Sequence, residues 1–328
     1  MITEGFELAD YACSSANSRG RAIEEKSSTS RTEFQRDRDR IIHSSAFRRL
    51  EYKTQVFVNH EGDLFRTRLT HTLEVAQIAR TTATLLKINP DLTEAIALAH
   101  DLGHTPFGHA GEYILNEICE DGFAHYKQSV RVVEILEKKG QGLNLTREVR
   151  DGMLNHRTSG HPSTLEGKIV RLSDKIAYIN HDIDDAIRGK IITERDIPRE
   201  YADVLGDTVK DRLNIMIHDI INNSMDRPSI FMSPDVERAM RGLREWMFEH
   251  VYRNPAAKGE EGRAQQLIVT LYEYYLKHVD ELPEEYLAMM ELRGEKKERV
   301  VCDYIAGMSD GYAIDRFEEL FVPKGWNV

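Results

Sequence analysis

Apolar residues recur every three or four positions along most of the chain, which is the period of an amphipathic helix. The first long stripe of this kind consists of Leu69, Leu73, Ala76, Ala79 and Ala83. Asn89-Pro90-Asp91 ends that helix and begins the next one, which covers 92–102. The same period predicts further helices over 112–120, 127–138, 146–156, 166–188, 199–224, 235–252, 262–281, 284–292 and 296–308. The pattern therefore predicts an all-α fold, a helical bundle.

Few segments depart from the helical pattern. Gln55-Val56-Phe57-Val58 is the best candidate for a strand, and Asn254–Gly262 is the clearest loop and the predicted border of a C-terminal helical lobe. We expect an N-terminal arm with basic character (1–45), a core (46–190) and a C-terminal helical region that packs on the core (191–328).

Length and composition indicate an intracellular protein. A chain of 328 residues can bury a sizeable core. Three scattered cysteines, Cys13, Cys119 and Cys302, are too few for a disulfide framework, which favours a reducing compartment. There is no signal core and no apolar stretch of about 20 residues, so we expect a cytoplasmic protein with no membrane contact.

The net charge is 44 − 55 = −11, which opposes nucleic-acid binding as the default function. Basic charge is concentrated locally in residues 19–49, with Arg19, Arg21, Lys26, Arg31, Arg36, Arg38, Arg40, Arg48 and Arg49 against five acids. Two interpretations stay open: a solvated arm of mixed charge, or a site for a phosphorylated ligand or an acidic neighbouring subunit.

The stretch 100–112 concentrates the chemistry of the chain. It places three histidines and two carboxylates around a Pro/Gly turn, which cannot form the interior of a helix. The dipeptide His100-Asp101 is not distinctive alone, because His181-Asp182 and His218-Asp219 repeat it. Its setting is distinctive, since a histidine lies upstream (His71) and an aspartate well downstream (Asp174).

These four side chains form a candidate metal site. Neighbouring residues on a helix point about 100° apart, so His100 and Asp101 can reach one ion only where the helix ends. Two imidazoles and two carboxylates suit Mn²⁺, Fe²⁺, Ni²⁺, Zn²⁺ or Mg²⁺. The alternative treats His71 as a core histidine, Asp101 as a helix-end carboxylate and Asp174 as a surface charge. The combination of all four with the turn favours the metal site.

A second group of residues could transfer protons. His109 and Glu112 lie three residues apart at the start of a helix, so both can face one cavity. A carboxylate beside a histidine holds its tautomer and raises its pKa. The alternative is that Glu112 only interacts with the helix dipole. His125 follows downstream, and we assign His104 to structural support.

The 166–188 segment carries a polar stripe on an otherwise apolar helix. Its members recur at four, four and three residues and are Asp174, Tyr178, Asp182 and Asp185. A solvated face would explain the stripe, but a tyrosine beside a candidate metal ligand favours a substrate wall. Lys175 could offset phosphate charge.

Several longer sequence segments resemble those of a known family. They are Phe47–Val56, Arg68–Val75, the 100–112 turn, His125 with Gln128-Ser129, Asp174–Tyr178 and, more weakly, the neighbourhood of 303–312. The chain resembles the HD-domain phosphohydrolases, and most closely the deoxyguanosine triphosphate triphosphohydrolase-like branch. The resemblance implies an HD-type helical bundle over 46–190 with additional C-terminal helices.

The resemblance also implies roles for single residues. The metal ligands would be His71, His100, Asp101 and Asp174. The proton-transfer pair would be His109 and Glu112, with His125 at the α-phosphate. The sugar and phosphate contacts would be Gln55, Arg68, Lys175, Tyr178 and Asp182. The implied reaction is metal-dependent hydrolysis of a deoxynucleoside triphosphate to a deoxynucleoside and tripolyphosphate.

Further expectations follow from the resemblance, and alternatives stay open. The family resemblance implies a homo-oligomer and leaves open whether a nucleotide also acts as an activator. An HD nucleotidase or phosphodiesterase is the alternative enzyme, in which His109 and His125 would bind a second metal. A nucleotide-sensing or single-stranded nucleic-acid-binding protein is the alternative outside enzymes, supported by 19–49 alone. The absence of a P-loop motif means that phosphate binding must depend on side chains and metal.

Overall fold

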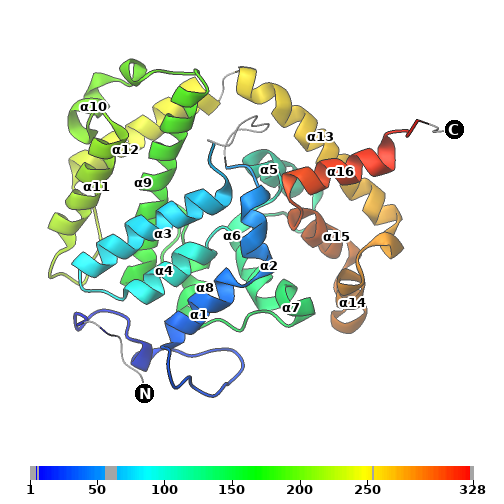
Figure 1. Ribbon diagram of the computed structural model, residues 1–328, viewed down its shortest axis with the longest axis horizontal. Coiled ribbons are helices and arrows are strands. Elements are labelled where there is room, and N and C mark those ends of the chain that lie inside the picture. The colour runs from blue at the N-terminus through cyan, green and yellow to red at the C-terminus, as the bar shows by residue number, and fades with distance from the viewer. Residues whose placement is uncertain (1–4, 6, 56–64, 253–254, 326–328) are drawn as a thin grey trace.

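The computed structural model describes residues 5, 7–55, 65–252 and 255–325, and helices dominate them (Figure 1). Within these ranges no strand forms, and Thr54 and Thr67 make one isolated antiparallel bridge. The predicted all-α fold is confirmed. Of the predicted strand over 55–58, Gln55 lies in a bend and the other positions lie outside the described residues.

The helices have the following bounds. They are α1 (Glu33–Ile42), α2 (Ser45–Arg49), α3 (Arg68–Leu85), α4 (Pro90–Ala99), α5 (Gly108–Ile118), α6 (His125–Arg131), α7 (Glu137–Gly140), α8 (Arg147–Leu154), α9 (Leu165–Arg188), α10 (Arg199–Leu205), α11 (Val209–Ser224), α12 (Pro234–Met247), α13 (Pro255–Lys277), α14 (Glu284–Arg293), α15 (Lys297–Ala306) and α16 (Asp310–Phe321). Short π-helical segments, Val132–Leu136 and Phe248–Tyr252, follow α6 and α12.

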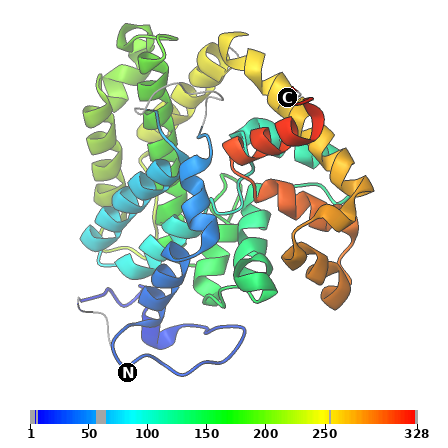
Figure 2. The same cartoon turned by 45° about the vertical axis from the view of Figure 1, so that its right-hand side comes forward.

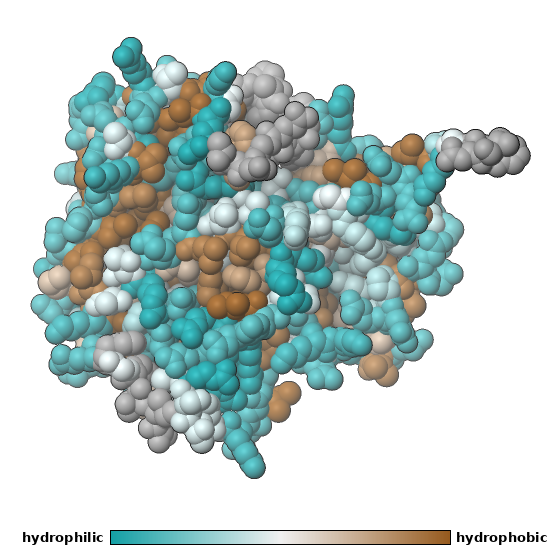
Figure 3. Space-filling model, in the orientation of Figure 1, coloured by the Kyte–Doolittle hydropathy of each residue, from teal (hydrophilic) through white to brown (hydrophobic). Residues whose placement is uncertain are grey.

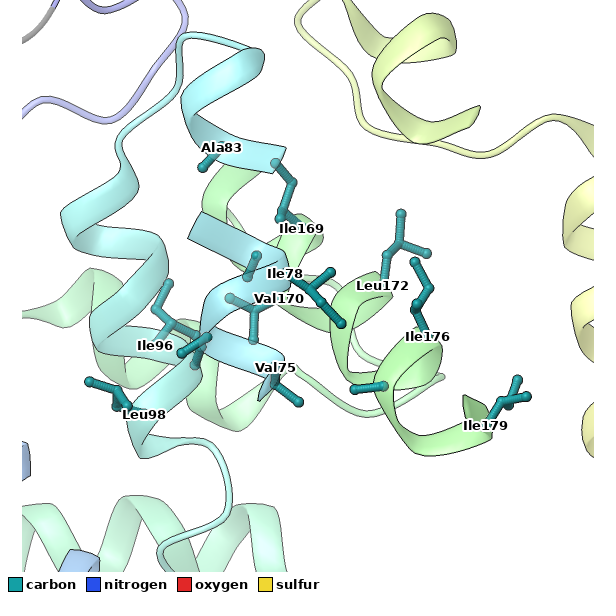
Figure 4. Packing of buried hydrophobic residues seen from close by; sticks show 14 of the residues in the cluster. Val75, Ile78, Ala83, Ile96, Leu98, Ile169, Val170, Leu172, Ile176 and Ile179 are labelled. Atoms are coloured by element: carbon teal, nitrogen blue, oxygen red, sulfur yellow. The ribbon is translucent and has the colours of Figure 1, made fainter. Parts of the chain in front are cut away.

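Helices α3, α4 and α9 form the centre of the larger hydrophobic core. Val75 and Ile78 of α3 pack with Ile96 of α4 and with Ile169 and Ile176 of α9, all nearly inaccessible to solvent (Figure 4). Burying each such side chain contributes roughly 1.5–3 kcal/mol. This packing holds α3 and α9, which carry predicted site residues, in fixed register.

The turn between α4 and α5 is shaped by close backbone contacts. A Cβ on Gly103 would lie 2.1 Å from the backbone nitrogen of Ser129, so α6 packs directly against the turn. Phe107 (φ 60°) and Gly108 (φ 56°) adopt left-handed conformations that reverse the chain into α5. The predicted end of the helix before the turn is therefore observed.

The basic segment 19–49 pairs with acids of the same chain. Arg21 contacts Glu33 and Asp37, and Arg40 contacts Glu25. Further pairs are Arg19–Glu148, Arg31–Asp39, Arg36–Glu33 and Arg38–Glu94. Acids of the same chain neutralise the charges of these arginines, which weakens the case for a site that binds a phosphorylated ligand.

Several segments differ from the sequence prediction: helices α1, α2 and α16 were not predicted, and two predicted segments have a different structure. The predicted helix over 199–224 is broken at Gly206 (φ 99°), which separates α10 from α11. The predicted loop over 254–262 is wrong from Pro255 onward, because these residues form the first turns of α13. Proline is favoured at a first helical position and Ala256 and Ala257 favour helix, so local propensity outweighs the glycines. Asn254 lies outside the described residues.

The C-terminal helices form a second hydrophobic cluster with α5. Tyr275 of α13 and Val300 of α15 are buried with Leu115 of α5 and Phe107 of the turn. Figures 1 and 2 show α14–α16 on one side of the molecule and α10–α12 on the other. The face in Figure 3 is mostly hydrophilic with separate hydrophobic areas. No helix in the described part of the chain has the length and apolar character needed to cross a membrane.

Candidate active site

A cavity of about 630 Å³ lies between the turn and helices α3, α9 and α12. The predicted residues that line it are Gln55, Arg68, His71, Asp101, His109, His125, Asp174, Lys175 and Tyr178. The structure thus brings together residues that are more than 100 positions apart in the chain. Asp182 does not line this cavity but lies one turn from Tyr178 on α9.

The four predicted metal ligands converge. Ligand atoms of His71, His100 and Asp101 lie within 4.8 Å of one another. Asp174 Oδ1 is 3.2 Å from His71 Nε2 and 3.7 Å from His100 Nε2. His71 comes from α3, Asp174 from α9, and the other two from the end of α4.

The chemistry of this cluster fits a divalent cation. His100 Nδ1–H donates to the carbonyl of Ala97 (2.6 Å), which leaves Nε2 directed at the cluster. Among the described residues this buried Nε2 has no hydrogen-bond partner. Burial opposes charge on His100, yet Asp101 and Asp174 raise its pKa to about 9. The carboxylates therefore favour a positive charge here, which a metal ion would supply.

Arg68 orients one metal-ligand candidate. Its Nη1 donates to Asp101 Oδ2 at 2.8 Å, and both side chains are buried. The other oxygen, Oδ1, lies 3.5 Å from His100 Nε2. Burial opposes ionisation, but His100 and Arg68 hold the pKa of Asp101 below its usual range. The Asp101 carboxylate is thus ionised and fixed in direction.

Glu112 contacts both histidines of the predicted proton-transfer group. Its Oε1 accepts hydrogen bonds at 2.8 Å from the ring Nδ1 and the backbone nitrogen of His125. His109 Nδ1 lies farther away, 3.6 Å from Glu112 Oε2, and its side chain is 61% exposed. Although burial opposes it, His109 and His125 lower the pKa of Glu112. The closer partner is His125, whereas spacing alone suggested His109.

His156 is a cavity residue that sequence reasoning missed. Its side chain is buried, and its Nε2 is 3.2 Å from His125 Nε2. Burial and the neighbouring His100 lower the pKa of His156 to about 4. A single histidine at the end of the predicted 146–156 helix offers no signal that it lies beside the turn. His104 stacks on the ring of His125, with ring centroids 4.2 Å apart.

A second cavity of about 760 Å³ adjoins the first and is more aromatic. Its rings come from Phe107, Tyr113, Tyr178, Phe248 and Tyr252. Tyr252 donates a hydrogen bond to Asp182, and its ring centroid is 6.0 Å from that of Tyr178. Burial raises the pKa of Asp182 to about 8. The aspartate on the polar stripe therefore belongs to a tyrosine cluster.

Six cationic side chains line the first cavity, together with the carboxylates of Asp101, Asp174, Glu237 and Glu245. The cations are Arg68, Arg157, Arg171, Lys175, Arg241 and Arg244. Four of them were not predicted, because an arginine outside a recognisable motif normally marks a solvated face. His109, Tyr178, Arg241 and Arg244 line both cavities, so the cationic and aromatic cavities are continuous at these side chains.

Comparison with known proteins identifies matching domains and relatives. The HD domain matches residues 68–179, and the phosphohydrolase-associated domain matches 230–319. A deoxyguanosinetriphosphate triphosphohydrolase-like protein of Caldanaerobacter subterraneus subsp. tengcongensis is 56% identical, covering 99% of this chain and 96% of its own. Proteins of the same name from Desulfatibacillum aliphaticivorans and Clostridium tetani are each 45% identical; each alignment covers 98% of this chain, and 98% and 95% of theirs.

A solved structure of a hypothetical protein from Aquifex aeolicus is more distantly similar. It has a TM-score of 0.47 and 20% identity, and the match covers 88% of this chain and 68% of that one. The sequence relatives are decisive, because they are similar over nearly the full length of both chains. The chain therefore belongs to the deoxyguanosinetriphosphate triphosphohydrolase-like family of HD-domain phosphohydrolases.

Proposed function

We propose that the protein hydrolyses deoxynucleoside triphosphates to deoxynucleoside and tripolyphosphate, with a divalent metal ion. The observation that carries this proposal is the set of six cationic side chains that line the cavity beside the His/Asp cluster. A triphosphate carries about four negative charges and the chain carries −11, so local cations must supply the attraction. The names of the relatives support a dGTP-like substrate.

The metal would be held by His71, His100, Asp101 and Asp174. When bound, it would polarise an α-phosphate oxygen and lower the pKa of a water molecule. The mixed nitrogen and oxygen donors suit Mn²⁺, Mg²⁺, Fe²⁺, Ni²⁺ or Zn²⁺. Arg68 would neutralise phosphate charge while holding Asp101 in place.

His109 is the residue that we assign to protonation of the leaving 5′-oxygen. The bond that breaks joins the triphosphate to the nucleoside, and His109 lines both the cationic and the aromatic cavity. Glu112 lies 3.6 Å from its Nδ1 and would orient the ring. We assign His125, held by the same carboxylate, to the α-phosphate.

The remaining predicted contacts divide between phosphate and sugar. Lys175 follows Asp174 on α9 and would contact phosphate, whereas Tyr178 would contact the deoxyribose. Asp182 lines neither cavity and accepts a hydrogen bond from Tyr252, so it would act on the sugar site by holding the tyrosines in place. Gln55 is buried at the edge of the cavity and would complete the sugar site.

An HD nucleotidase or phosphodiesterase is a second candidate. Ligand atoms of Asp101, His125 and His156 lie within 4.8 Å of one another, which could hold a second ion. Metal content separates the candidates: one tightly bound ion per active chain supports the triphosphohydrolase, and two with release of single phosphates support the alternative.

A substrate panel tests the proposal. All four dNTPs and GTP are incubated with Mn²⁺ or Mg²⁺, and the products are separated by anion-exchange chromatography. We expect tripolyphosphate and deoxynucleoside in equal amounts. Release of orthophosphate or pyrophosphate without tripolyphosphate would contradict the proposed reaction.

Variants of the metal ligands test the site itself. His100→Ala or Asp101→Ala should abolish metal binding and hydrolysis while circular dichroism shows an intact helical fold. His218→Ala changes the exposed histidine of a repeated His-Asp dipeptide on α11 and should change neither property. Near-normal turnover by either ligand variant with metal still bound would reject the assignment.

A further inference from the structure

His71 makes contacts on both edges of its ring. It is buried on α3, and its Nε2 faces Asp174 and the metal-site cluster. Its Nδ1, on the other edge, lies 3.1 Å from Nδ1 of His181 on α9. The proposed function involves only the Nε2 edge of His71, and the contact of Nδ1 with His181 has no role in it.

His181 is in turn held by Glu74. Its Nε2 lies 2.5 Å from Glu74 Oε2, and Arg66 Nε donates to the same oxygen at 3.1 Å. Arg66 Nη1 also donates to Asp184 and Asp185, both at 2.8 Å. The same oxygen of Glu74 is therefore shared by His181 and by an arginine that two further carboxylates hold in place.

The spacing along two helices explains why these groups meet. His71 and Glu74 are three residues apart on α3, and Asp174 and His181 are seven apart on α9, so each pair shares one helix face. The two faces pack together, and the chain Asp174–His71–His181–Glu74 alternates between the helices.

The contacts determine where the protons lie. Burial opposes ionisation of Glu74, but His181 and Arg66 lower its pKa, so Glu74 is a carboxylate that can only accept. A neutral His181 then carries its proton on Nε2 and presents the Nδ1 lone pair to His71. His71 must donate through Nδ1–H, which leaves its Nε2 lone pair facing the metal site.

We propose that His181 and Glu74 are positioning residues, which fix the tautomer and direction of His71 as a metal ligand. This inference rests on the metal site of the proposed function. A metal-binding histidine usually donates its other N–H to a carboxylate or carbonyl. Here a second histidine stands between the ligand and the carboxylate.

Metal affinity without nucleotide tests this role directly. Free Mn²⁺ is measured by electron paramagnetic resonance during titration of the full-length protein. His181→Phe keeps a planar ring and removes the acceptor, and we expect Mn²⁺ affinity to fall about 10- to 100-fold. His181→Asn places an oxygen near the position of Nδ1 and should restore most of the affinity.

Two further variants complete the series. Glu74→Gln keeps the shape of a side chain that is 42% exposed and removes the charge, so we expect a smaller loss of affinity with an unchanged melting temperature. His218→Phe is the matched control and should bind Mn²⁺ as the unmodified protein does. Nitrogen NMR of labelled histidines should show that His71 is protonated on Nδ1 in the unmodified protein. In the Glu74→Gln variant, a form of His71 protonated on Nε2 should appear.

The outcomes separate this inference from the proposed function. Unchanged Mn²⁺ affinity in both His181→Phe and Glu74→Gln would overturn the positioning role. If His181→Phe loses Mn²⁺ affinity and His181→Asn does not restore it, the positioning role is also overturned, because that role depends on a hydrogen-bond acceptor at position 181. If the unmodified protein binds Mn²⁺ but hydrolyses no dNTP, the proposed function fails and the affinity series still decides the role of His181.

Discussion

Glu112 accepts a hydrogen bond from His125 and lies 3.6 Å from His109, so one carboxylate lies beside both histidines. We predict that Glu112→Gln lowers kcat by about 10²- to 10⁴-fold, the usual contribution of an acid–base group. Bound Mn²⁺ should stay nearly constant, because Glu112 is not among the proposed metal ligands. Single-turnover kinetics and metal analysis measure both effects.

The control for this variant lies on the same helix. Glu117 of α5 is exposed, and Glu117→Gln should leave kcat unchanged. A loss of metal that parallels the loss of turnover in Glu112→Gln would instead assign the Glu112–His125 pair to metal binding, as in the two-metal alternative.

Asp182 should make folding stability depend on pH. Burial raises its folded pKa to about 8, above the ordinary 3.8, so the folded state holds a proton that the unfolded chain has lost. Stability from this group is therefore present below about pH 4 and is lost as pH rises toward 8, by up to about 1.4 kcal/mol per pH unit. We predict that the melting temperature of Asp182→Asn, relative to the unmodified protein, rises between pH 5 and 8.

Asp184 on the same helix is the control for the pH dependence. Despite partial burial, Arg66 lowers its pKa, so its contribution is constant above pH 5 and is lost only as pH falls below the ordinary value. Asp184→Asn should thus show a difference in melting temperature that is flat between pH 5 and 8. A flat difference for Asp182→Asn would contradict an elevated pKa.

Single residues differ in how well the sequence predicts them. The convergence of His71, His100 and Asp101 was predicted because a helix end and a Gly/Pro turn restrict where these side chains can point. His156 and Tyr252 were missed, since each stands alone at the end of a predicted helix (146–156 and 235–252) and only tertiary packing brings it to the cavities. The catalytic and binding roles assigned to all of these residues stay predictions.

At the scale of elements, the turn depends on the helix that packs against it. A methyl group on Gly103 would meet the backbone of Gln128 and Ser129, which cannot move without shifting α6 and His125. We predict that Gly103→Ala costs roughly 1–3 kcal/mol of folding free energy and lowers activity further than stability explains. Urea unfolding and kcat/KM measured at a temperature where the variant is folded would show both losses.

Gly262 is the matched glycine in open space within α13. Gly262→Ala should stabilise the protein by about 0.5–1 kcal/mol, as expected inside a helix. Destabilisation by Gly262→Ala would contradict the helical assignment of this segment, and an unchanged Gly103→Ala would contradict the tight packing of the turn.

Helices with long apolar stripes were the easiest elements to predict. The predicted 166–188 helix matches α9 (Leu165–Arg188) closely, because its buried stripe persists over many turns. Helix α1 was missed although Thr32 and Gln35 form a capping box, since its arginines and acids obscure the two buried apolar positions, Phe34 and Ile41.

At the scale of the whole molecule, the C-terminal helices hold the turn in place. Buried Lys53 donates to the carbonyls of His104 and Ala306, and Asp310 accepts from the backbone nitrogens of Thr54 and Phe107. These long-range contacts could not be predicted from spacing, which indicated only a weak family match near 303–312. The domain borders, the oligomer, a nucleotide activator and the cytoplasmic location stay predictions.

We expect substrate choice to depend on segments from distant parts of the chain, because Tyr178 of α9 meets Tyr252 beyond α12 in the aromatic cavity. A ring packed against C2′ of the sugar leaves no room for a 2′-hydroxyl, and burying that group without a partner costs about 1–3 kcal/mol. We predict that kcat/KM for dGTP exceeds that for GTP by at least about tenfold. Tyr178→Ala should reduce this ratio, whereas Tyr178→Phe, which keeps the ring, should preserve it. Equal hydrolysis of GTP and dGTP by the unmodified protein would show that the tyrosines do not exclude the 2′-hydroxyl and would favour a less selective phosphohydrolase.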